Sequence, residues 1–163
     1  MTMDQTFEVR LRLKALSEEV EDSLVEYLGA LVSRFSGVPY VTIFQDATSG
    51  MEAAHRLLGR VKDFGCEVVS VDPDFVTRTE IAERLGASRQ AVSHWVSGQR
   101  QAEFPFPLPA IQAGISLWCW SDVVDWARAS KHLADEEDVS LLSADEIAVA
   151  NGELAAGRMP VFA

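Results

Sequence analysis

Hydrophobic and polar residues alternate without interruption from Phe7 to Leu13, which predicts a β-strand. The apolar positions are odd-numbered and the residues between them are Glu8, Arg10 and Arg12. Successive side chains of a strand point to opposite faces of its sheet. One face of this strand is therefore expected to be buried, and the other is expected to carry charge.

The rest of the first half predicts two helices and three more strands. Ser17 is expected to cap a helix whose apolar stripe contains Val20, Leu24, Val25 and Leu28, and residues 50–64 predict a second helix ended by Gly65. Strands are expected at 31–35 and 40–44, joined by a turn at Ser36-Gly37, and at 66–71. The resulting order of strands and helices, βαββαβ, predicts a ferredoxin-like α+β domain over residues 1–74.

The polar face of this predicted sheet carries Arg10, Arg12 and Lys14. The pattern favours a solvated face whose charges pair across strands. Two alternatives remain open: an RNA-binding surface, if Tyr40 and Phe44 share the face and stack bases, and a dimer interface. This half contains no nucleophile–base pair and no glycine-rich phosphate loop, and a ferredoxin-like fold alone assigns no function.

Residues 77–95 predict two short helices joined by a tight turn. Thr77 and Glu80 have the spacing of a capping box, Gly86 is expected to end the first helix, and Ser88 is expected to cap the second. Val92 and Trp95 are expected to face the core. Four polar side chains are expected to face outward in the second helix: Arg89, Gln90, Ser93 and His94. This is the pattern of a helix-turn-helix with a recognition helix.

The residues that follow predict a small hairpin and a last helix. Three alternating prolines over 105–109 favour an extended path, and residues 110–120 predict a hairpin that turns at Ala113-Gly114. Ser121-Asp122 is expected to cap a helix with Val123 and Trp126 facing inward. Trp118 and Trp120 are expected to pack in the core or the hairpin rather than to stack on bases.

The runs EIAERLGASRQAVSHW, FPFPLP, LWCW and SDVVDWARA together resemble the MerR/excisionase-like branch of the winged helix-turn-helix proteins, over residues 77–129. In that family the hairpin forms a wing whose last strand runs into a helix containing a tryptophan. The resemblance implies DNA contacts by Arg89, Gln90, Ser93 and His94. Arg78, Ser88 and Arg100 complete the expected DNA-binding set. The family's wing is often basic, whereas residues 101–121 here contain no Lys or Arg.

The charge distribution sets the expected affinity and oligomeric state. The net charge is −11, which argues against a nonspecific nucleic-acid binder because phosphate contacts dominate such binding. Residues 1–76 carry −6, residues 77–131 carry +1, and residues 132–163 carry −6. The segment with the motif is thus the least acidic. With so little positive charge, one recognition helix is not expected to bind tightly alone, so a homodimer is predicted.

Residues 132–163 predict an acidic tail with a short helix. Asp135 to Asp138 form an acidic run, Ser143 begins a second capping box, and Asn151-Gly152 is expected to end the helix. The tail is expected either to be a solvated extension or to restrain nonspecific DNA binding by competing with phosphates.

Several classes of protein are not expected. Cys66 and Cys119 are far apart in the sequence, so we expect buried free thiols in a reducing cytosol and no disulfide. The three histidines are scattered along the chain, so no metal site is predicted. We predict neither a membrane span nor a signal peptide. Neither a cofactor nor a catalytic residue is indicated, and the protein is not expected to be an enzyme.

The sequence thus predicts a cytoplasmic α+β protein with three parts: the ferredoxin-like domain, a winged helix-turn-helix over residues 75–131, and the acidic tail. The expected function is sequence-specific binding of duplex DNA as a dimeric transcription regulator. One alternative is a protein–protein adaptor that uses a degenerate helix-turn-helix as a docking surface. Another is a small-ligand sensor acting through the first domain, with an effector that the sequence does not identify.

Overall fold

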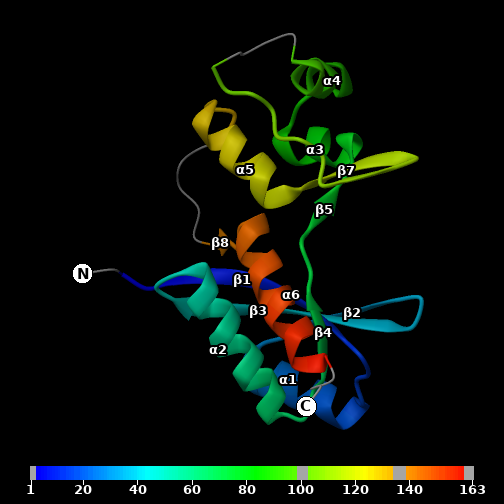
Figure 1. Ribbon diagram of the computed structural model, residues 1–163, viewed down its shortest axis with the longest axis vertical. Helices are drawn as coiled ribbons and strands as arrows, with labels where there is room; N and C mark the ends of the chain where they lie inside the picture. The colour runs from blue at the N-terminus through cyan, green and yellow to red at the C-terminus, as the bar shows by residue number, and fades with distance from the viewer. Residues whose placement is uncertain (1–2, 99–102, 134–138, 160–163) are drawn as a thin grey trace. The chain divides into compact units, whose positions relative to one another are not determined.

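The protein is a mixed α+β protein that divides into two compact units (Figure 1). The computed structural model describes residues 3–98, 103–133 and 139–159. In that part of the chain the sheet unit comprises residues 3–72 and 139–159. The tryptophan unit comprises residues 73–98 and 103–133, and it contains all four tryptophans. None of the six helices in these ranges combines the length and the apolar composition needed to cross a bilayer.

The sheet unit is built on a mixed sheet whose main path has the order β2-β3-β1-β4. Its strands are β1 (Gln5–Leu13), β2 (Leu31–Phe35), β3 (Val38–Ala47), β4 (Val68–Val71) and β8 (Ser140–Leu141). The neighbours on the main path are antiparallel, and β8 pairs with β1 in parallel. The alternation that predicts β1 is confirmed, since Phe7, Val9, Leu11 and Leu13 are all buried.

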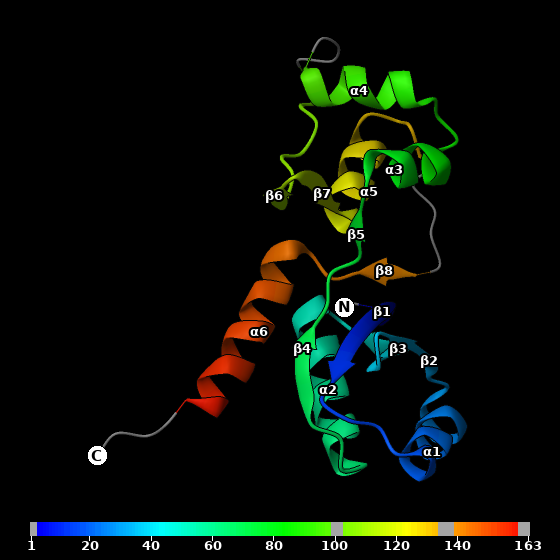
Figure 2. The same cartoon turned by 90° about the vertical axis from the view of Figure 1, so that its right-hand side faces the viewer.

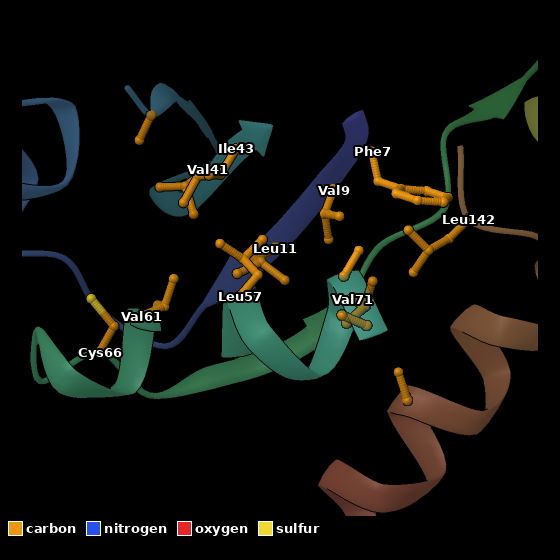
Figure 3. Close-up of a cluster of buried hydrophobic side chains, with 14 of the residues drawn as sticks. Phe7, Val9, Leu11, Val41, Ile43, Leu57, Val61, Cys66, Val71 and Leu142 are labelled. Carbon is orange, nitrogen blue, oxygen red and sulfur yellow. The ribbon is translucent and has the colours of Figure 1, made fainter. Parts of the chain in front are cut away.

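Two helices cover one face of this sheet, and both start where the sequence predicts. α1 (Glu18–Leu28) is capped by Ser17, whose hydroxyl accepts a hydrogen bond from the amide of Val20. Leu24 is fully buried, but Val25 is 48% exposed, so its expected place in the apolar stripe is wrong. α2 (Gly50–Asp63) packs Leu57 and Val61 toward the inward side chains of β1 and β3 (Figure 3).

The turn between β2 and β3 is also the predicted one. Ser36 and Gly37 have φ values of 50° and 80°. A two-residue hairpin with positive φ at both positions matches the right-handed twist of the flanking strands. β3 is longer than expected and runs from Val38 to Ala47, because its pairing with β1 continues to Ala47.

The C-terminal segment belongs to the sheet unit, so the prediction of a peripheral acidic tail is wrong for residues 139–159. α6 (Ala144–Arg158) begins with the predicted capping box at Ser143 but continues past Asn151 to Arg158. Leu142, Ile147 and Ala150 are buried in the core of the sheet unit. The acidic run at 135–138 lies outside the described residues.

α6 also packs along β4 and provides hydrogen-bond partners for its backbone, and the two elements lie side by side in Figure 2. The side-chain amide of Asn151 accepts a hydrogen bond from the amide of Val71 at 2.7 Å and donates one to the Val71 carbonyl at 2.8 Å. Arg158 donates to the carbonyl of Val69 at 3.1 Å. Asn151 does not end the helix because its side chain bonds to the neighbouring strand rather than to its own backbone.

α6 approaches α2 closely near Gly50. A Cβ atom at position 50 would displace the carboxylate of Glu146, the flexible end of a side chain that lies over the first turn of α2. Further along the two helices, His55 Nε2 lies 2.7 Å from Glu153 Oε2. These contacts, together with the buried side chains, fix α6 on the sheet unit.

The tryptophan unit combines three helices with a three-stranded sheet of order β5-β7-β6. Its elements are β5 (Phe75–Val76), α3 (Arg78–Leu85), α4 (Arg89–Ser97), β6 (Ile111–Ala113), β7 (Ile115–Cys119) and α5 (Trp120–Ala129). The predicted hairpin is present, and Gly114 adopts the positive φ of 74° at its turn. β5 was not predicted, because two residues are too few to show an alternation.

The start of α5 differs from the prediction. The helix begins at Trp120 with Cys119 as its N-cap, and Ser121 is buried inside the first turn rather than capping it. β7 ends at Cys119 and α5 begins at the next residue, so the strand runs directly into the helix, and the Cys119 side chain makes no capping hydrogen bond at the helix start. The amide of Trp120 donates instead to the carbonyl of Asp74 at 2.8 Å.

Aromatic side chains form much of the core of the tryptophan unit. The rings of Trp95, Phe106 and His132 pack around Trp126, with centroid distances of 4.8–4.9 Å to it. Two indole N–H groups hold the proline-rich segment by its backbone. Trp126 donates to the Phe104 carbonyl at 2.8 Å, and Trp118 donates to the Pro107 carbonyl at 2.9 Å.

Candidate nucleic-acid interface

Capping interactions define the start of α3, the turn between α3 and α4, and the start of α4. The hydroxyl of Thr77 accepts a hydrogen bond from the amide of Glu80 at 3.2 Å, and the Glu80 carboxylate accepts one from the amide of Thr77 at 2.8 Å. Gly86 has a φ of 63° and ends α3, and the hydroxyl of Ser88 accepts from the amide of Ala91 at 3.0 Å. The predicted capping box, turn glycine and second cap are therefore all confirmed.

The inward side chains of this helical hairpin fix which face of α4 is exposed. Ile81 and Val92 are fully buried, Trp95 is almost so, and Ala82 provides a small side chain in the same cluster. Rotation of α4 about its axis would bring Val92 and Trp95 into water, which is unfavourable by about 1.5–3 kcal/mol for each large side chain. The opposite face of α4 is therefore held outward.

The predicted contact residues of α4 lie on that outward side. Arg89 and Gln90 are exposed in the first turn, and neither side chain has a partner among the described residues. Ser93 and His94 follow four residues later and are half-buried. Because residues four apart are neighbours on a helix, Arg89 lies next to Ser93 and Gln90 next to His94. Ser88 is exposed but uses its hydroxyl as the helix cap.

The basic residues around α4 have different environments. Arg78 is exposed at the start of α3, with its guanidinium 5.7 Å from the centroid of the Trp118 ring. Arg84 forms an ion pair with Asp74 at 2.5 Å and lies over the ring of Trp120. Its charge is thus compensated within the unit. Arg100 lies outside the described residues, so Arg78 and Arg89 represent the expected positive stripe in the described part.

The hairpin of β6 and β7 has an apolar surface. Ile115 is 60% exposed at its turn, Ile111 is partly exposed, and Leu108 in the preceding segment is 85% exposed. The sequence here contains no Lys or Arg. The hairpin therefore lacks the positive charges that bind phosphates.

The sheet unit contains a second group of candidate residues. Tyr40 and Phe44, whose direction the sequence left open, lie on the same face as Arg10 and Arg12, because Tyr40 pairs in register with Arg12 and Phe44 with Glu8. Phe35, which the sequence pattern does not single out, belongs to the same face and is 57% exposed. It shares one face of β2 with Leu31 and Ser33, and most of this strand is exposed.

Other chemistry is not assembled in the described residues. Cys66 and Cys119 are both buried, and burial raises the pKa of the Cys66 thiol. Nowhere in the described ranges do three His, Cys, Asp or Glu side chains form a group that could hold a metal ion. No protein-family model, curated protein or solved structure matches this chain.

Proposed function

We propose that the protein is a sequence-specific regulator that binds duplex DNA, with α4 entering the major groove. The observation that carries this proposal concerns Arg89 and Gln90, which are exposed and have no partner within residues 3–98, 103–133 and 139–159. Both lie in the first turn of a helix whose other face is packed into a core. The first residues of a recognition helix reach base edges, where Arg reads guanine and Gln reads adenine through paired hydrogen bonds.

The remaining features of the chain support the same proposal. β7 runs straight into α5 (Figure 1), as in the MerR/excisionase-like winged helix-turn-helix proteins that residues 77–129 resemble. The tryptophan unit would then be the winged domain, and the sheet order β2-β3-β1-β4 is consistent with a ferredoxin-like plan for the sheet unit. We place the protein in the cytoplasm, where buried free thiols persist.

The regulator is proposed to act as a homodimer. The segment 77–131 has a net charge of only +1, so one copy makes few phosphate contacts. Two copies place two recognition helices on half-sites about one helical turn of DNA apart, which multiplies the specific contacts. No effector molecule or cofactor is part of the proposal.

Selection from a random duplex pool, followed by titration of the enriched duplex, tests the proposal. Arg89→Ala is expected to weaken binding by about 1–3 kcal/mol, which corresponds to roughly 5- to 150-fold in the dissociation constant. Gln90→Ala is expected to relax the preference at one base position. Lys62→Ala serves as the matched control, because it removes one exposed positive charge from α2 in the sheet unit. Unchanged affinity in both α4 variants would exclude α4 as the recognition helix.

The apolar hairpin favours a second candidate, an adaptor that binds another protein through the tryptophan unit. Leu108 and Ile115 present apolar surface where a DNA-binding wing presents charge. Contacts to phosphates make DNA binding fall steeply with salt, whereas an apolar protein interface depends much less on salt. If no sequence is enriched and no duplex is retained even at low salt, the adaptor becomes the better assignment.

A further inference from the structure

The sheet unit covers one face of its sheet with helices and leaves the other face open among its own described residues. Leu24 of α1 and Leu57 of α2 both belong to the core that contains the inward residues of β1. Figure 3 shows Leu57 next to Leu11 on that inner side. The opposite face carries the alternate residues of β1, including Arg10 and Arg12.

Large apolar side chains are exposed on this open face. Leu31 is 61% exposed, Phe35 57% and Phe44 42%, and all three lie on the adjacent strands β2 and β3. The ring of Phe35 packs edge-to-face against Tyr40 at 5.6 Å. Single exposed apolar residues are common, but several on two adjacent strands of one sheet face indicate an interaction surface.

The charges on this face separate along the strands. At one end Arg12 is exposed directly across from Tyr40. Arg10 lies at the middle of the face, and its guanidinium extends toward the same end, 4.7 Å from the centroid of the Tyr40 ring. At the other end Glu8 is opposite Phe44, and Asp46 accepts a hydrogen bond from Thr6. One end of the face is thus positive and the other is negative.

We propose that this face binds a second copy of the chain through a two-fold axis that crosses the strands near Arg10 and Thr42. Such an axis reverses the strand direction in the partner. Arg12 of each copy then faces the partner's Glu8, and Tyr40 faces the partner's Phe44. A two-fold interface uses the same patch twice, so a patch with opposite charges at its two ends is complementary to itself.

A single-stranded nucleic acid fits this face less well, although aromatic and Arg side chains occur together on it. Such a ligand needs positive charge along the whole path of its backbone, beside the stacking rings. Glu8 lies directly across from Phe44, so a base stacked on this ring would bring its phosphates near a carboxylate. Residues 1–76 also carry a net charge of −6. A second copy instead brings the positive end of one face opposite the negative end of the other.

Sedimentation equilibrium of the full-length protein without DNA tests the interface. The wild type is expected to dimerise. Arg12→Glu and Glu8→Arg are each expected to raise the dissociation constant about tenfold or more, because like charges then meet. The double variant is expected to restore dimerisation, since the exchanged charges face each other again. Lys62→Glu, on the exposed side of α2, changes the net charge by the same amount as Arg12→Glu and is expected to leave dimerisation unchanged.

Three results would each overturn the proposal: a wild type that is monomeric at all concentrations, a double variant whose dimerisation is not restored, or a dimer dissociation constant that Arg12→Glu leaves unchanged. Phe44→Thr, which keeps a strand-forming residue, adds a second test, since it removes the ring from the interface. If that variant loses binding to labelled oligothymidylate or oligouridylate while the dimer is unchanged, the face binds single strands instead. The inference does not require DNA binding by α4: Arg89→Ala is expected to leave the dimer intact, so the two proposals fail separately.

Discussion

The two units of this protein solve the problem of a small core in different ways. The sheet unit packs aliphatic side chains such as Leu11, Ile43 and Leu57 between a sheet and its helices. The tryptophan unit has short strands and a proline-rich segment, and it packs Trp95, Trp118 and Trp126 instead. In the sheet unit, backbone groups are satisfied mainly by strand pairing. In the tryptophan unit, indole N–H groups satisfy carbonyls that lie outside regular structure.

This difference determines how strongly each unit is destabilised by the loss of one core side chain. A sheet–helix core spreads its stability over many similar contacts, so one truncated side chain leaves the rest in place. A ring such as that of Trp126 buries a large area and also donates a hydrogen bond, so its loss removes two kinds of stabilisation at once. The position of α4 depends on this aromatic cluster through Trp95.

The largest effect is expected from removing the segment that completes the sheet unit. Truncation after Leu133 deletes Leu142 and Ile147 from the core, which costs about 3–6 kcal/mol at roughly 1.5–3 kcal/mol for each side chain. The loss of the Asn151 hydrogen bonds adds to this cost. Urea denaturation followed by the amide NMR signals of β1 and β3 measures it.

A matched pair of substitutions controls for the effect of shortening the chain. Ile147→Ser is expected to lower the stability of the sheet unit, whereas Val149→Ser, at a position that is half exposed on the same helix, is expected to change it little. A truncated protein with wild-type stability would mean that α6 is peripheral to the sheet unit.

The next effect separates the two cores directly. Trp126→Ala is expected to destabilise the tryptophan unit by about 3–5 kcal/mol, and Trp126→Phe, which keeps a ring but loses the N–H donor, by about 1–3 kcal/mol. Leu57→Ala is expected to destabilise the sheet unit by about 2–5 kcal/mol. Fluorescence reports on the tryptophan unit, since all four tryptophans lie there, and the NMR signals of β1 report on the sheet unit. Equal shifts of both signals in every variant would show that the two cores unfold as one.

The smallest effect concerns a surface ion pair of the sheet unit. The hydrogen bond from Arg34 holds the pKa of Glu21 below its ordinary value, and the charge of Arg34 acts in the same direction. A carboxylate with a lowered pKa stabilises the fold above its ordinary pKa, and this contribution is lost as the pH falls through the lowered value. Glu21→Gln is therefore expected to be slightly less stable than the wild type at pH 7 and to match it in strong acid. The difference should occur only in the NMR signals of the sheet unit.

Local signals in the sequence predicted many of the elements. The alternation from Phe7 to Leu13, the cap at Ser17 and the Ser36-Gly37 turn all depend on residues close in the chain, and all three are present. The same holds for the caps of α3 and α4 at Thr77 and Ser88. The outward direction of Arg89 and Gln90 followed from helical periodicity, because the buried positions of a short helix leave little choice for the others.

Features that depend on distant partners could not be predicted. β5 and β8 have two residues each and exist only through their pairing with β7 and β1. The ion pair of Arg84 requires Asp74, and nothing in the local sequence links them. The docking of α6 had a readable signal, since Ile147, Ala150 and Leu154 lie three and four residues apart. The acidic composition around them obscured it.

The insertion of one unit within the other has a consequence for protein synthesis. Residues 73–133 are complete when residues 139–159, which the sheet unit needs, have not yet been made. Domains tend to fold as they leave the ribosome, at about 5–20 residues per second. We expect the tryptophan unit to fold first, while the sheet unit is still incomplete because α6, which binds the backbone of β4, has not been made. Stalled or prematurely ended chains would then carry a folded α4 on an incomplete sheet unit, which marks them for removal by cellular proteases.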